Sequence, residues 1–426
     1  MTKLIEPGAR RGEVRATASK SQAHRYLICA ALTGHTVRVE NAGSSQDIRA
    51  TLACLSALLY ADGGTRRLDC GGEEMEGGQF SVQLHGKRRA GGIDCGESGT
   101  TLRFMLPLTG ALGADAEFML RGRLPERPIE PLARELCAHG MNIEHRGNIL
   151  RCSGALRPGA FTLPGDVSSQ FISGLLMALP MLPGDSTLNI TGQLQSAPYV
   201  AMTLEALRLS GISVTETADG YHIPGGQSYD APEMMTVEGD WSNAAPFLCM
   251  GALSHSGVAV TGLNPESVQG DRAIVQILRE LGAVVEVCGD RVSVRRGTLH
   301  GAVIDAAMIP DIIPALAALC AAADGETRIA NAGRLRLKES DRLGGTARLL
   351  RALGADARVD GDSLVIRGRP ELSGGTAETE SDHRMAMAAA VAACACRGAV
   401  TVTDPGCVKK SYPGFWDNLS SLEADK

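Results

Sequence analysis

A helical pattern of apolar positions that stops at a glycine recurs along the chain. In each copy the glycine is followed by one small or apolar residue and then by an alternating stretch such as Ala283–Val287, which predicts a strand after the helix. The copies are Leu52–Gly64, Leu132–Gly140, Leu204–Gly211, Ile277–Gly282, Leu349–Gly354 and a closing helix around Gly414–Leu422. From Gly140 to Gly354 the terminal glycines stand 71, 71 and 72 residues apart, so the 426 residues divide into about six repeats.

A second series of helices lies between the members of the first, and these are apolar on nearly every side, which predicts that they are buried. They are Ser21–Leu32, Ser98–Leu112, Ser168–Leu179, Ser242–Leu253, Ile309–Ala323 and Ser381–Cys394. Their polar residues gather in the first turn, where such residues commonly act as N-caps. Helix N-termini also attract anions. If the repeats pack side by side, these N-termini form one surface for an anionic ligand, framed by Lys and Arg.

Composition and charge exclude several classes of protein. The net charge of −6 provides no overall positive field for nucleic acid or an anionic membrane. The longest apolar runs, such as Met385–Cys396, are shorter than the roughly 20 residues of a membrane helix, and the N-terminus lacks a signal-peptide pattern. Twelve cysteines without a CxxC pair indicate buried thiols in a reducing cytoplasm, and no Cys/His cluster has the spacing of a metal site.

Charge-dense segments stand at the predicted helix starts and in the loops. They are Ser19–Arg25, Cys95–Arg103, Arg121–Pro128, Leu337–Leu343, Ser381–Met387 and Val408–Pro413. Any one of them could be a capped helix or a solvated turn. Asp311, alone at the start of an apolar helix, is either an N-cap or a catalytic base, and Glu339 is a candidate general acid/base. Together these segments hold more cations than carboxylates, and they contain no dinucleotide fingerprint. This set favours positioning and proton transfer on a multiply anionic small molecule.

Five short motifs, in this order and spacing, carry a resemblance to a known family. They are Ser19-Lys20-Ser21, Ser168-Ser169-Gln170, Ser196-Ala197-Pro198-Tyr199, Lys338-Glu339-Ser340-Asp341-Arg342-Leu343 and Asp382-His383-Arg384-Met385. From about Glu6 to Trp416 the chain resembles the 5-enolpyruvylshikimate-3-phosphate (EPSP) synthase family, the 3-phosphoshikimate 1-carboxyvinyltransferases.

The resemblance implies an α/β (α+β) fold with two domains, an inverse α/β barrel of six βαβαββ repeats with three in each domain. It implies an N-terminal domain at 19–238, a C-terminal domain at 1–18 and 239–426, and an active site in the cleft between them. The implied reaction moves the enolpyruvyl group of phosphoenolpyruvate to the 5-hydroxyl of shikimate 3-phosphate, releasing phosphate in chorismate and aromatic amino acid synthesis. It implies a cytoplasmic monomer with these two small-molecule substrates, no cofactor, no metal, and neither a nucleic-acid nor a membrane partner.

The resemblance also implies site residues. Shikimate 3-phosphate would be held by Lys20, Ser21, Arg25, Ser168, Ser169, Gln170, Ser196, Tyr199, Asp311 and Lys338. Phosphoenolpyruvate would be held by Lys20, Gly99, Arg123, Gln170, Arg342, Arg384 and Lys410. The implied catalytic residues are Lys20, which assists proton transfer, Asp311, which acts on the attacking hydroxyl, Glu339, which exchanges a proton with the methylene carbon, and Lys338, which supports it.

Three positions depart from the commoner pattern of the family. Glu97 and Arg334 stand where Asn is frequent, and Ala197 replaces a frequent Lys, which bears on inhibitor sensitivity and on details of substrate contact. One alternative is the UDP-N-acetylglucosamine enolpyruvyl transferase, which resembles this architecture but usually has a Cys in the loop that corresponds to Arg121–Arg127. The other is a non-catalytic anion-binding protein on the same scaffold, which predicts the loss of Lys20, Asp311 or Glu339.

Overall fold

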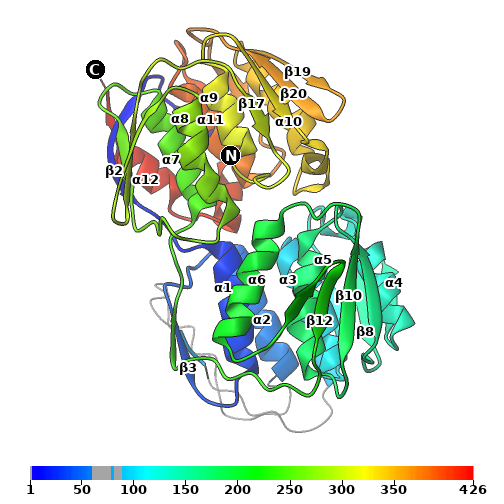
Figure 1. The fold of residues 1–426 in the computed structure, drawn as a ribbon. Helices are drawn as coiled ribbons and strands as arrows, with labels where there is room; N and C mark the ends of the chain where they lie inside the picture. Colours follow the sequence, from blue (N-terminus) through cyan, green and yellow to red (C-terminus); the bar gives the residue numbers. More distant parts are fainter. Residues whose placement is uncertain (1, 60–77, 81–88, 426) are drawn as a thin grey trace. The chain divides into compact units, whose positions relative to one another are not determined.

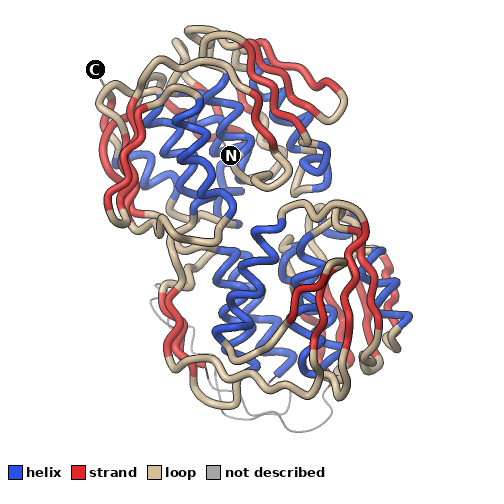
Figure 2. Tube along the Cα trace, viewed as in Figure 1, coloured by secondary structure: helices blue, strands red, loops and turns tan. Residues whose placement is uncertain are grey.

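The computed structural model describes residues 2–59, 78–80 and 89–425, so Gly64, the predicted end of one helix, lies outside the described residues. The chain forms two compact units. The terminal unit contains residues 1–19 and 238–426, and the middle unit contains residues 20–237. In each unit the helices lie inside and the strands outside (Figures 1 and 2).

Three sheets and the helices between them build the middle unit in the part of the chain that the structure describes. The sheet orders are β13-β3-β4, β5-β6-β8-β7 and β11-β12-β10-β9. The strands are β3 (Val37–Glu40), β4 (Gly78–Phe80), β5 (Arg89–Asp94), β6 (Asp115–Met119), β7 (Asn142–Arg146), β8 (Ile149–Ser153), β9 (Ala160–Pro164), β10 (Ser186–Thr191), β11 (Thr215–Thr217), β12 (Gly220–Ile223) and β13 (Met234–Thr236). The helices are α1 (Lys20–Leu32), α2 (Gln46–Leu59), α3 (Gly99–Ala111), α4 (Glu130–Ala138), α5 (Ser169–Ala178) and α6 (Ala197–Leu209), with 3-10 turns η1 (Leu124–Glu126) and η2 (Leu179–Met181).

The terminal unit has the same design over its described residues. Its sheet orders are β1-β22-β21, β15-β16-β14-β2-β23 and β17-β18-β20-β19. The strands are β1 (Thr2–Ile5), β2 (Arg10–Arg15), β14 (Val258–Thr261), β15 (Val284–Cys288), β16 (Arg291–Arg295), β17 (Val303–Asp305), β18 (Glu326–Ala330), β19 (Asp356–Asp360), β20 (Ser363–Arg367), β21 (Gly375–Ala377), β22 (Val400–Thr403) and β23 (Glu423–Ala424). The helices are α7 (Trp241–Ala252), α8 (Ile274–Glu280), α9 (Ile313–Cys320), α10 (Arg342–Ala352), α11 (His383–Ala393) and α12 (Phe415–Ser421), with 3-10 turns η3 (Gly270–Ala273), η4 (Gly333–Leu337) and η5 (Pro405–Lys410).

The sheets repeat one pattern of strand pairing. In each, two strands pair in parallel, as β5 pairs with β6, and a further strand adds antiparallel, as β8 does. In the terminal unit β2 pairs in parallel with β14, with the buried Val14 opposite the buried Val260, although the whole middle unit separates these strands in the chain. The predicted fold of six repeats in two domains is therefore confirmed.

Glycine ends the helices where the sequence pattern predicts. Gly140, Gly211, Gly282 and Gly354 have φ values of +104°, +75°, +88° and +94°, a region that favours glycine, and each follows a helix by one or two residues. The closing helix is α12. The chain crosses between the units where the backbone of Ser19 donates to the carbonyl of Glu238 over 2.8 Å.

The second helical series is buried as predicted, and its helices form the cores. In the terminal unit α7, α9 and α11 pack against one another, and in the middle unit α3 packs on α5 and α1 on α6. One predicted start is wrong. The helix expected at Ile309–Ala323 begins at Ile313, because Pro314 is tolerated only in the first turn, where its missing N–H needs no partner. Over the described residues, none of the helices has the length and apolar character to cross a membrane.

Candidate active site

The first turns of several helices meet in the middle unit. Lys20 Nζ of α1 lies 2.8 Å from Asp47 Oδ2 of α2, and the Thr101 hydroxyl of α3 lies 3.4 Å from the Asp47 carbonyl. Nε2 of Gln170, in the first turn of α5, donates to Thr100 Oγ1 over 2.7 Å. The helix packing thus brings residues from four separate segments to one end of the unit, where N-terminal N–H groups and dipoles favour an anion.

A buried chain of hydroxyl groups fixes this end of the unit. His24 Nδ1 lies 2.7 Å from Thr51 Oγ1, which lies 2.7 Å from Thr101 Oγ1. The Thr101 hydroxyl donates to the Ser98 hydroxyl over 2.7 Å, and Ser98 caps α3 directly before Gly99. Burial lowers the pKa of His24 well below its usual value, so the ring is neutral in this apolar surrounding.

Arg25 is buried beneath the first turns of α1 and α6. Its Nε donates to Thr203 Oγ1 over 2.7 Å, and its Nη2 donates to the Tyr199 carbonyl over 2.7 Å. Its Nη1 donates to the Ser21 carbonyl over 2.5 Å. Burial lowers the pKa of Arg25 to about 10, which still leaves it charged at neutral pH. In this arrangement Arg25 holds the segments of Ser21 and Tyr199 together.

The predicted serines also lie at helix starts. Ser168 caps α5, since its Oγ accepts from the backbone of Gln170 over 3.3 Å, and Ser169 begins that helix; both are buried. Ser196 precedes α6 with φ of +57°, and Tyr199 stands in the first turn of the same helix. The capping interpretation is therefore confirmed at Ser168, and a role for its oxygen in ligand binding stays a prediction.

The arginine that lies against Gly99 is Arg127. A β-carbon at Gly99 would stand 2.5 Å from Nη1 and 2.7 Å from Cζ of Arg127, and Nε of Arg127 is buried without a hydrogen-bond partner among the described residues. The predicted Arg123 has a side chain that is 52% exposed and pairs with Glu126 over 3.4 Å. Arg127 is thus the better placed cation for an anion at the start of α3.

Arg103 is a second residue to which the sequence analysis gave no role. Its Nη1 donates to Gln170 Oε1 over 2.6 Å, and its Nη2 donates to the Pro128 carbonyl over 3.0 Å. It therefore links Gln170 to the loop that carries Arg127. Its spacing of four residues from Gly99, which places both on one face of α3, was the available signal.

Arg342 is the centre of the candidate site in the terminal unit. Its side chain is 1% exposed and donates to carboxylates from three segments of the chain. Nη1 donates to Asp311 Oδ1 over 2.7 Å, Nη2 to Glu339 Oε2 over 2.5 Å and Nε to Asp382 Oδ2 over 2.8 Å. The planar fork of arginine suits such multiple contacts, and the charge of Arg342 holds two predicted catalytic carboxylates in place.

The charges around Asp311 determine its protonation. Burial alone would raise the pKa of Asp311, but the charges of Lys338, Arg342 and Arg384 outweigh burial and hold this pKa well below the usual range. Lys338 Nζ lies 3.5 Å from Asp311 Oδ1, and burial lowers the pKa of Lys338. Asp311 is not an N-cap, because Ile312 occupies that position of α9. Because of this low pKa, Asp311 is an ionised carboxylate at neutral pH.

Arg384 and Lys410 supply further positive charge. Nη1 of Arg384 donates to the Ser242 carbonyl over 2.8 Å and to Asn243 Oδ1 over 3.0 Å. Nε of Arg384 is buried and has no hydrogen-bond partner among the residues that the structure describes. Lys410 Nζ donates to the Ser381 carbonyl over 2.7 Å, close in sequence to Arg384.

The three residues that depart from the commoner family pattern lie in three different segments of the structure. The Glu97 carboxyl lies against Gly122, where a β-carbon would stand 2.6 Å from Oε2. Ala197 is the first residue of α6. Arg334 stands in η4, and its charge adds to burial in lowering the pKa of Lys338, while the charge of Asp311 opposes this change.

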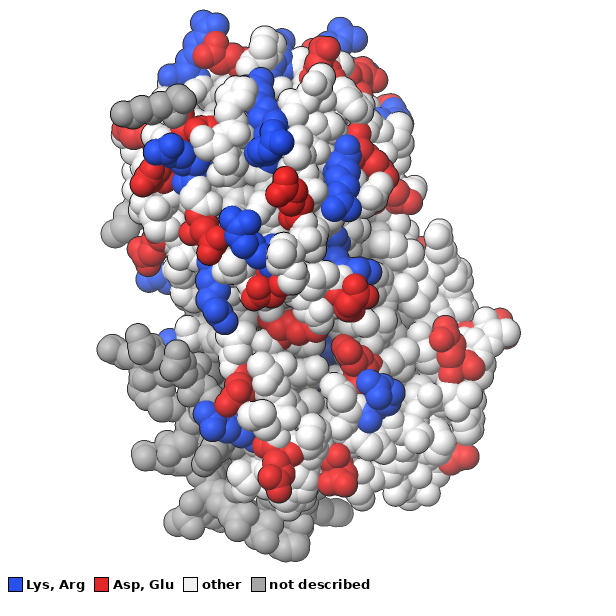
Figure 3. All heavy atoms as spheres, turned by 60° about the vertical axis from the view of Figure 1, so that its left-hand side comes forward, with Lys and Arg blue, Asp and Glu red and all other residues white. Residues whose placement is uncertain are grey.

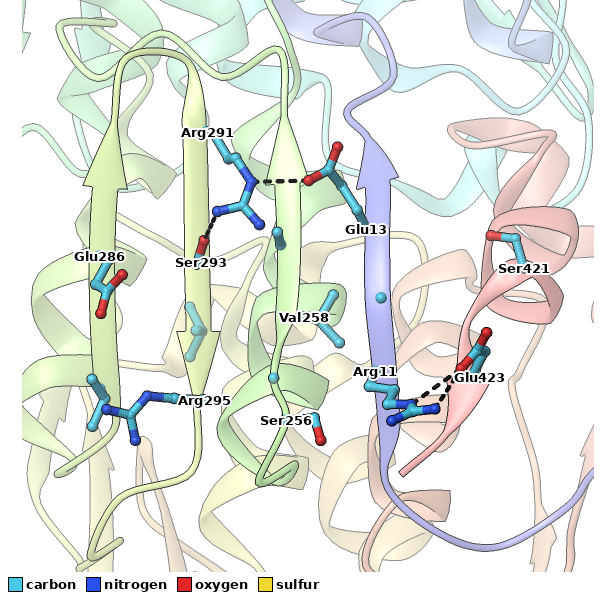
Figure 4. Close-up of a pocket in the computed structure, with 15 residues that line it drawn as sticks. Arg11, Glu13, Ser256, Val258, Glu286, Arg291, Ser293, Arg295, Ser421 and Glu423 are labelled. Carbon is cyan, nitrogen blue, oxygen red and sulfur yellow. Dashed lines mark hydrogen bonds and ion pairs between the residues drawn. The ribbon is translucent and has the colours of Figure 1, made fainter. Parts of the chain in front are cut away.

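A hollow elsewhere in the terminal unit shows none of these features. It has a volume of about 610 Å³ and lies on the outer face of the five-stranded sheet (Figure 4). Its charges satisfy one another, since Arg291 pairs with Glu13 over 2.9 Å and Arg11 with Glu423 over 2.7 Å. On the face drawn in Figure 3, basic and acidic side chains are interspersed.

Comparisons with known proteins agree with this arrangement. The family model of EPSP synthase (3-phosphoshikimate 1-carboxyvinyltransferase) matches residues 5–419. The chain belongs to the EPSP synthase family. A 3-phosphoshikimate 1-carboxyvinyltransferase of Clostridium kluyveri is 38% identical over 98% of this chain and 96% of its own length. One of Clostridium acetobutylicum is 38% identical over 99% of this chain and 97% of its own length.

Solved structures of the EPSP synthase family and of a related transferase share the fold. An EPSP synthase of Acinetobacter baumannii superposes with a TM-score of 0.79 at 24% identity, covering 100% of this chain and 99% of that one. The enolpyruvyl transferase NikO of Streptomyces tendae superposes with a TM-score of 0.74 at 20% identity, covering 99% and 97%. The predicted membership of the EPSP synthase family is confirmed, and the comparisons do not favour the UDP-N-acetylglucosamine alternative.

Proposed function

We propose that this chain transfers the enolpyruvyl group of phosphoenolpyruvate to the 5-hydroxyl of shikimate 3-phosphate, with release of phosphate. Relatives that carry this activity in their names match the chain over nearly its whole length. The observation that carries the proposal is the set of contacts around Arg342, where the ionised Asp311 and the carboxyl group of Glu339 meet one guanidinium among further cations.

The two units take different parts in this proposal. The middle unit holds shikimate 3-phosphate through Lys20, Ser21, Arg25, Ser168, Ser169, Gln170, Ser196 and Tyr199. The terminal unit supplies the cations for the phosphoenolpyruvate carboxylate and the acid/base groups. In each unit the phosphate and carboxylate groups would be bound by helix starts and by arginine side chains.

For the phosphate of phosphoenolpyruvate we propose Gly99, Lys410 and Arg127. Arg127 takes the place predicted for Arg123, because its guanidinium lies against Gly99 whereas Arg123 pairs with Glu126. We assign the binding of the phosphoenolpyruvate carboxylate to Arg384 and Arg342. Arg342 already donates to three carboxylates, so Arg384, with its buried and unpartnered Nε, offers the first contact.

The acid/base groups act in two balanced steps. Asp311 accepts the proton of the 5-hydroxyl as its oxygen bonds to C2 of phosphoenolpyruvate, and a proton passes from Glu339 to the methylene carbon C3. C3 then returns a proton to Glu339 as the bond from C2 to the phosphate oxygen breaks, and the proton held by Asp311 passes to the leaving phosphate. The products are the enolpyruvyl ether and hydrogen phosphate, and both carboxyl groups regain their starting protonation. Lys338, 3.5 Å from Asp311, and Lys20 compensate the negative charge that develops.

No cofactor enters this reaction in our proposal, and both partners are small molecules. We further propose a cytoplasmic monomer, in keeping with the eleven cysteines that are free thiols among the described residues.

The proposed function is tested by measuring phosphate release from phosphoenolpyruvate. Release is expected only when shikimate 3-phosphate is present. Release that depends on UDP-N-acetylglucosamine, or no release with either acceptor, would contradict the proposal.

A further inference from the structure

Asn243 connects Arg384 with Ser411, the residue after Lys410, in the terminal unit. It lies in the first turn of α7 and is completely buried. Its Oδ1 accepts from Arg384 Nη1 over 3.0 Å, and its Nδ2 donates to Ser411 Oγ over 3.2 Å. Ser411 directly follows Lys410. A single amide side chain therefore joins the start of α11 to the end of η5.

The contact with Asn243 decides which edge of Arg384 is left for a ligand. Nη1 donates both to Asn243 and to the Ser242 carbonyl, which uses the two hydrogens of that nitrogen. Nε of Arg384 is buried without a partner among the described residues. Because Nε and Nη2 form one edge of the planar guanidinium, that edge can bind a carboxylate through two parallel hydrogen bonds.

The turn that carries Asn243 is itself held from two sides. Asp240 Oδ1 accepts from the Asn243 backbone N–H over 2.9 Å, and the Ser242 hydroxyl donates to Asp271 Oδ2. Asp240 and Asp271 are buried. The amide of Asn243 thus meets Arg384 from a fixed position, which is what a site needs to orient a bound group.

We propose that Asn243 is a positioning residue that turns the Nε–Nη2 edge of Arg384 toward the substrate carboxylate and thereby sets the preference for a carboxylate-bearing phosphate ester. This inference rests on the proposed function, which places the carboxylate of phosphoenolpyruvate on Arg384. An amide is suited to this task because it accepts from the guanidinium without neutralising its charge.

The test compares Asn243→Asp and Asn243→Ala with the wild-type protein. Asn243→Asp keeps an oxygen facing Arg384 but adds a negative charge, and Asn243→Ala removes the contact. Both are expected to raise KM for phosphoenolpyruvate at least tenfold and to leave KM for shikimate 3-phosphate within twofold. Ser254→Ala is the control, since Ser254 is equally buried and hydrogen-bonded in the same unit but donates to Asp425 instead. Its KM values should match those of the wild type.

Equilibrium binding separates this inference from the proposed function. Calorimetric titrations with phosphoenolpyruvate and with inorganic phosphate are made on each protein without shikimate 3-phosphate, so that no reaction takes place. The variants should lose at least tenfold in affinity for phosphoenolpyruvate and less than twofold for inorganic phosphate, which lacks the carboxylate. An equal loss for both ligands, or no loss for either, would overturn the role of Asn243.

Folding is checked by thermal unfolding of every variant. A lower Tm with unchanged KM values would show a merely structural role for Asn243 and would also overturn the inference. If Asn243→Ala does not fold, the nearly isosteric Asn243→Asp carries the test alone. Absence of phosphate release by the wild-type protein refutes the proposed function, whereas the titrations still decide whether Asn243 controls carboxylate binding.

Discussion

Arg342 Nη1 lies 2.7 Å from Asp311 Oδ1 in the terminal unit, and the charges of Lys338, Arg342 and Arg384 together keep this carboxylate ionised. The same guanidinium donates to Glu339 and Asp382. The group that orders the acid/base residues is therefore itself a predicted ligand of the substrate carboxylate. If Arg342 binds the substrate carboxylate as we propose, that carboxylate competes with Asp311 and Glu339 for the hydrogen-bond donors of one guanidinium.

Replacing Arg342 by Lys is expected to affect both activity and stability. Lysine keeps the charge but cannot donate to three carboxylates in one plane. We expect kcat/KM to fall at least 100-fold, and the free energy of unfolding to fall by about 3–5 kcal/mol, as when one partner of a buried ion pair is removed. Steady-state kinetics and denaturant unfolding measure the two effects. Arg348→Lys is the control, because Arg348 lies on the same helix as Arg342 and makes an exposed ion pair with Glu380. A similar result for both variants would contradict this role of Arg342.

Glu339→Gln tests the proton transfer to the methylene carbon. Gln keeps the shape of the side chain, but its amide cannot act as a general acid or base. A positioned acid/base group contributes roughly 10²–10⁴ in rate. We expect kcat to fall more than tenfold, with KM for shikimate 3-phosphate nearly unchanged. Exchange of the methylene hydrogens with deuterated water should fall in parallel. A kcat equal to that of the wild type would remove Glu339 from the mechanism.

Gly99→Ala tests the close approach of Arg127 to the start of α3. The added β-carbon would stand 2.5 Å from Nη1 of Arg127, so the guanidinium must move. We expect KM for phosphoenolpyruvate to rise at least tenfold while KM for shikimate 3-phosphate changes less than threefold. Gly34→Ala is the matched control in the same unit, because nothing lies within 4 Å of a β-carbon at Gly34. An unchanged KM in Gly99→Ala would show that Arg127 does not bind the substrate from this position.

Arg127→Gln and Arg123→Gln decide which arginine of the basic loop binds the anion. The first removes the guanidinium that lies against Gly99, and the second removes an exposed one that pairs with Glu126. Exposed ion pairs of this kind contribute roughly 0–1 kcal/mol to stability. We therefore expect a rise in KM for phosphoenolpyruvate of at least 30-fold for Arg127→Gln and less than twofold for Arg123→Gln. The reverse order would restore the role that the resemblance implied for Arg123.

The repeats and the helix stops could be predicted from the sequence because they depend on local patterns. Apolar periodicity and a glycine such as Gly282 specify a helix and its end without reference to the rest of the chain. The choice between Arg123 and Arg127 could not be predicted in this way. Both lie in one basic loop, and the 3-10 turn at Leu124–Glu126 decides which of them lies against Gly99.

Contacts between segments that are distant in the chain could not be predicted from the sequence pattern. The motif around Arg342 gave a cation and two nearby acidic residues. It did not show that the carboxylates of Asp311 and Asp382, 31 and 40 residues away, accept hydrogen bonds from the same guanidinium. Asp271 carried no signal at all, since it stands in a short 3-10 turn outside every motif. Only the packing of η3 beside α7 brings it to Ser242.

Asp271 is expected to make stability depend on pH. Burial raises the pKa of Asp271 to about 7, and the charge of Asp311 adds to this rise, so that Asp271 holds the proton and Asp311 the charge. The ordinary pKa is 3.8. Between these two values the folded protein binds a proton that the unfolded chain has lost, so the free energy of unfolding falls as pH rises through this window and levels off above it.

Asp271→Asn removes this titration while its Oδ1 can still accept from the Ser242 hydroxyl. Because the variant has no proton to lose there, its stability relative to the wild type should increase from pH 5 to pH 7 by roughly 2–3 kcal/mol, as expected from about 1.4 kcal/mol per pH unit. Urea unfolding at pH 5, 6, 7 and 8 measures the difference, with Glu280→Gln on the exposed side of α8 as the control. Parallel stability curves for Asp271→Asn and the wild type would show that Asp271 is already ionised at pH 5 and that its environment does not hold the proton.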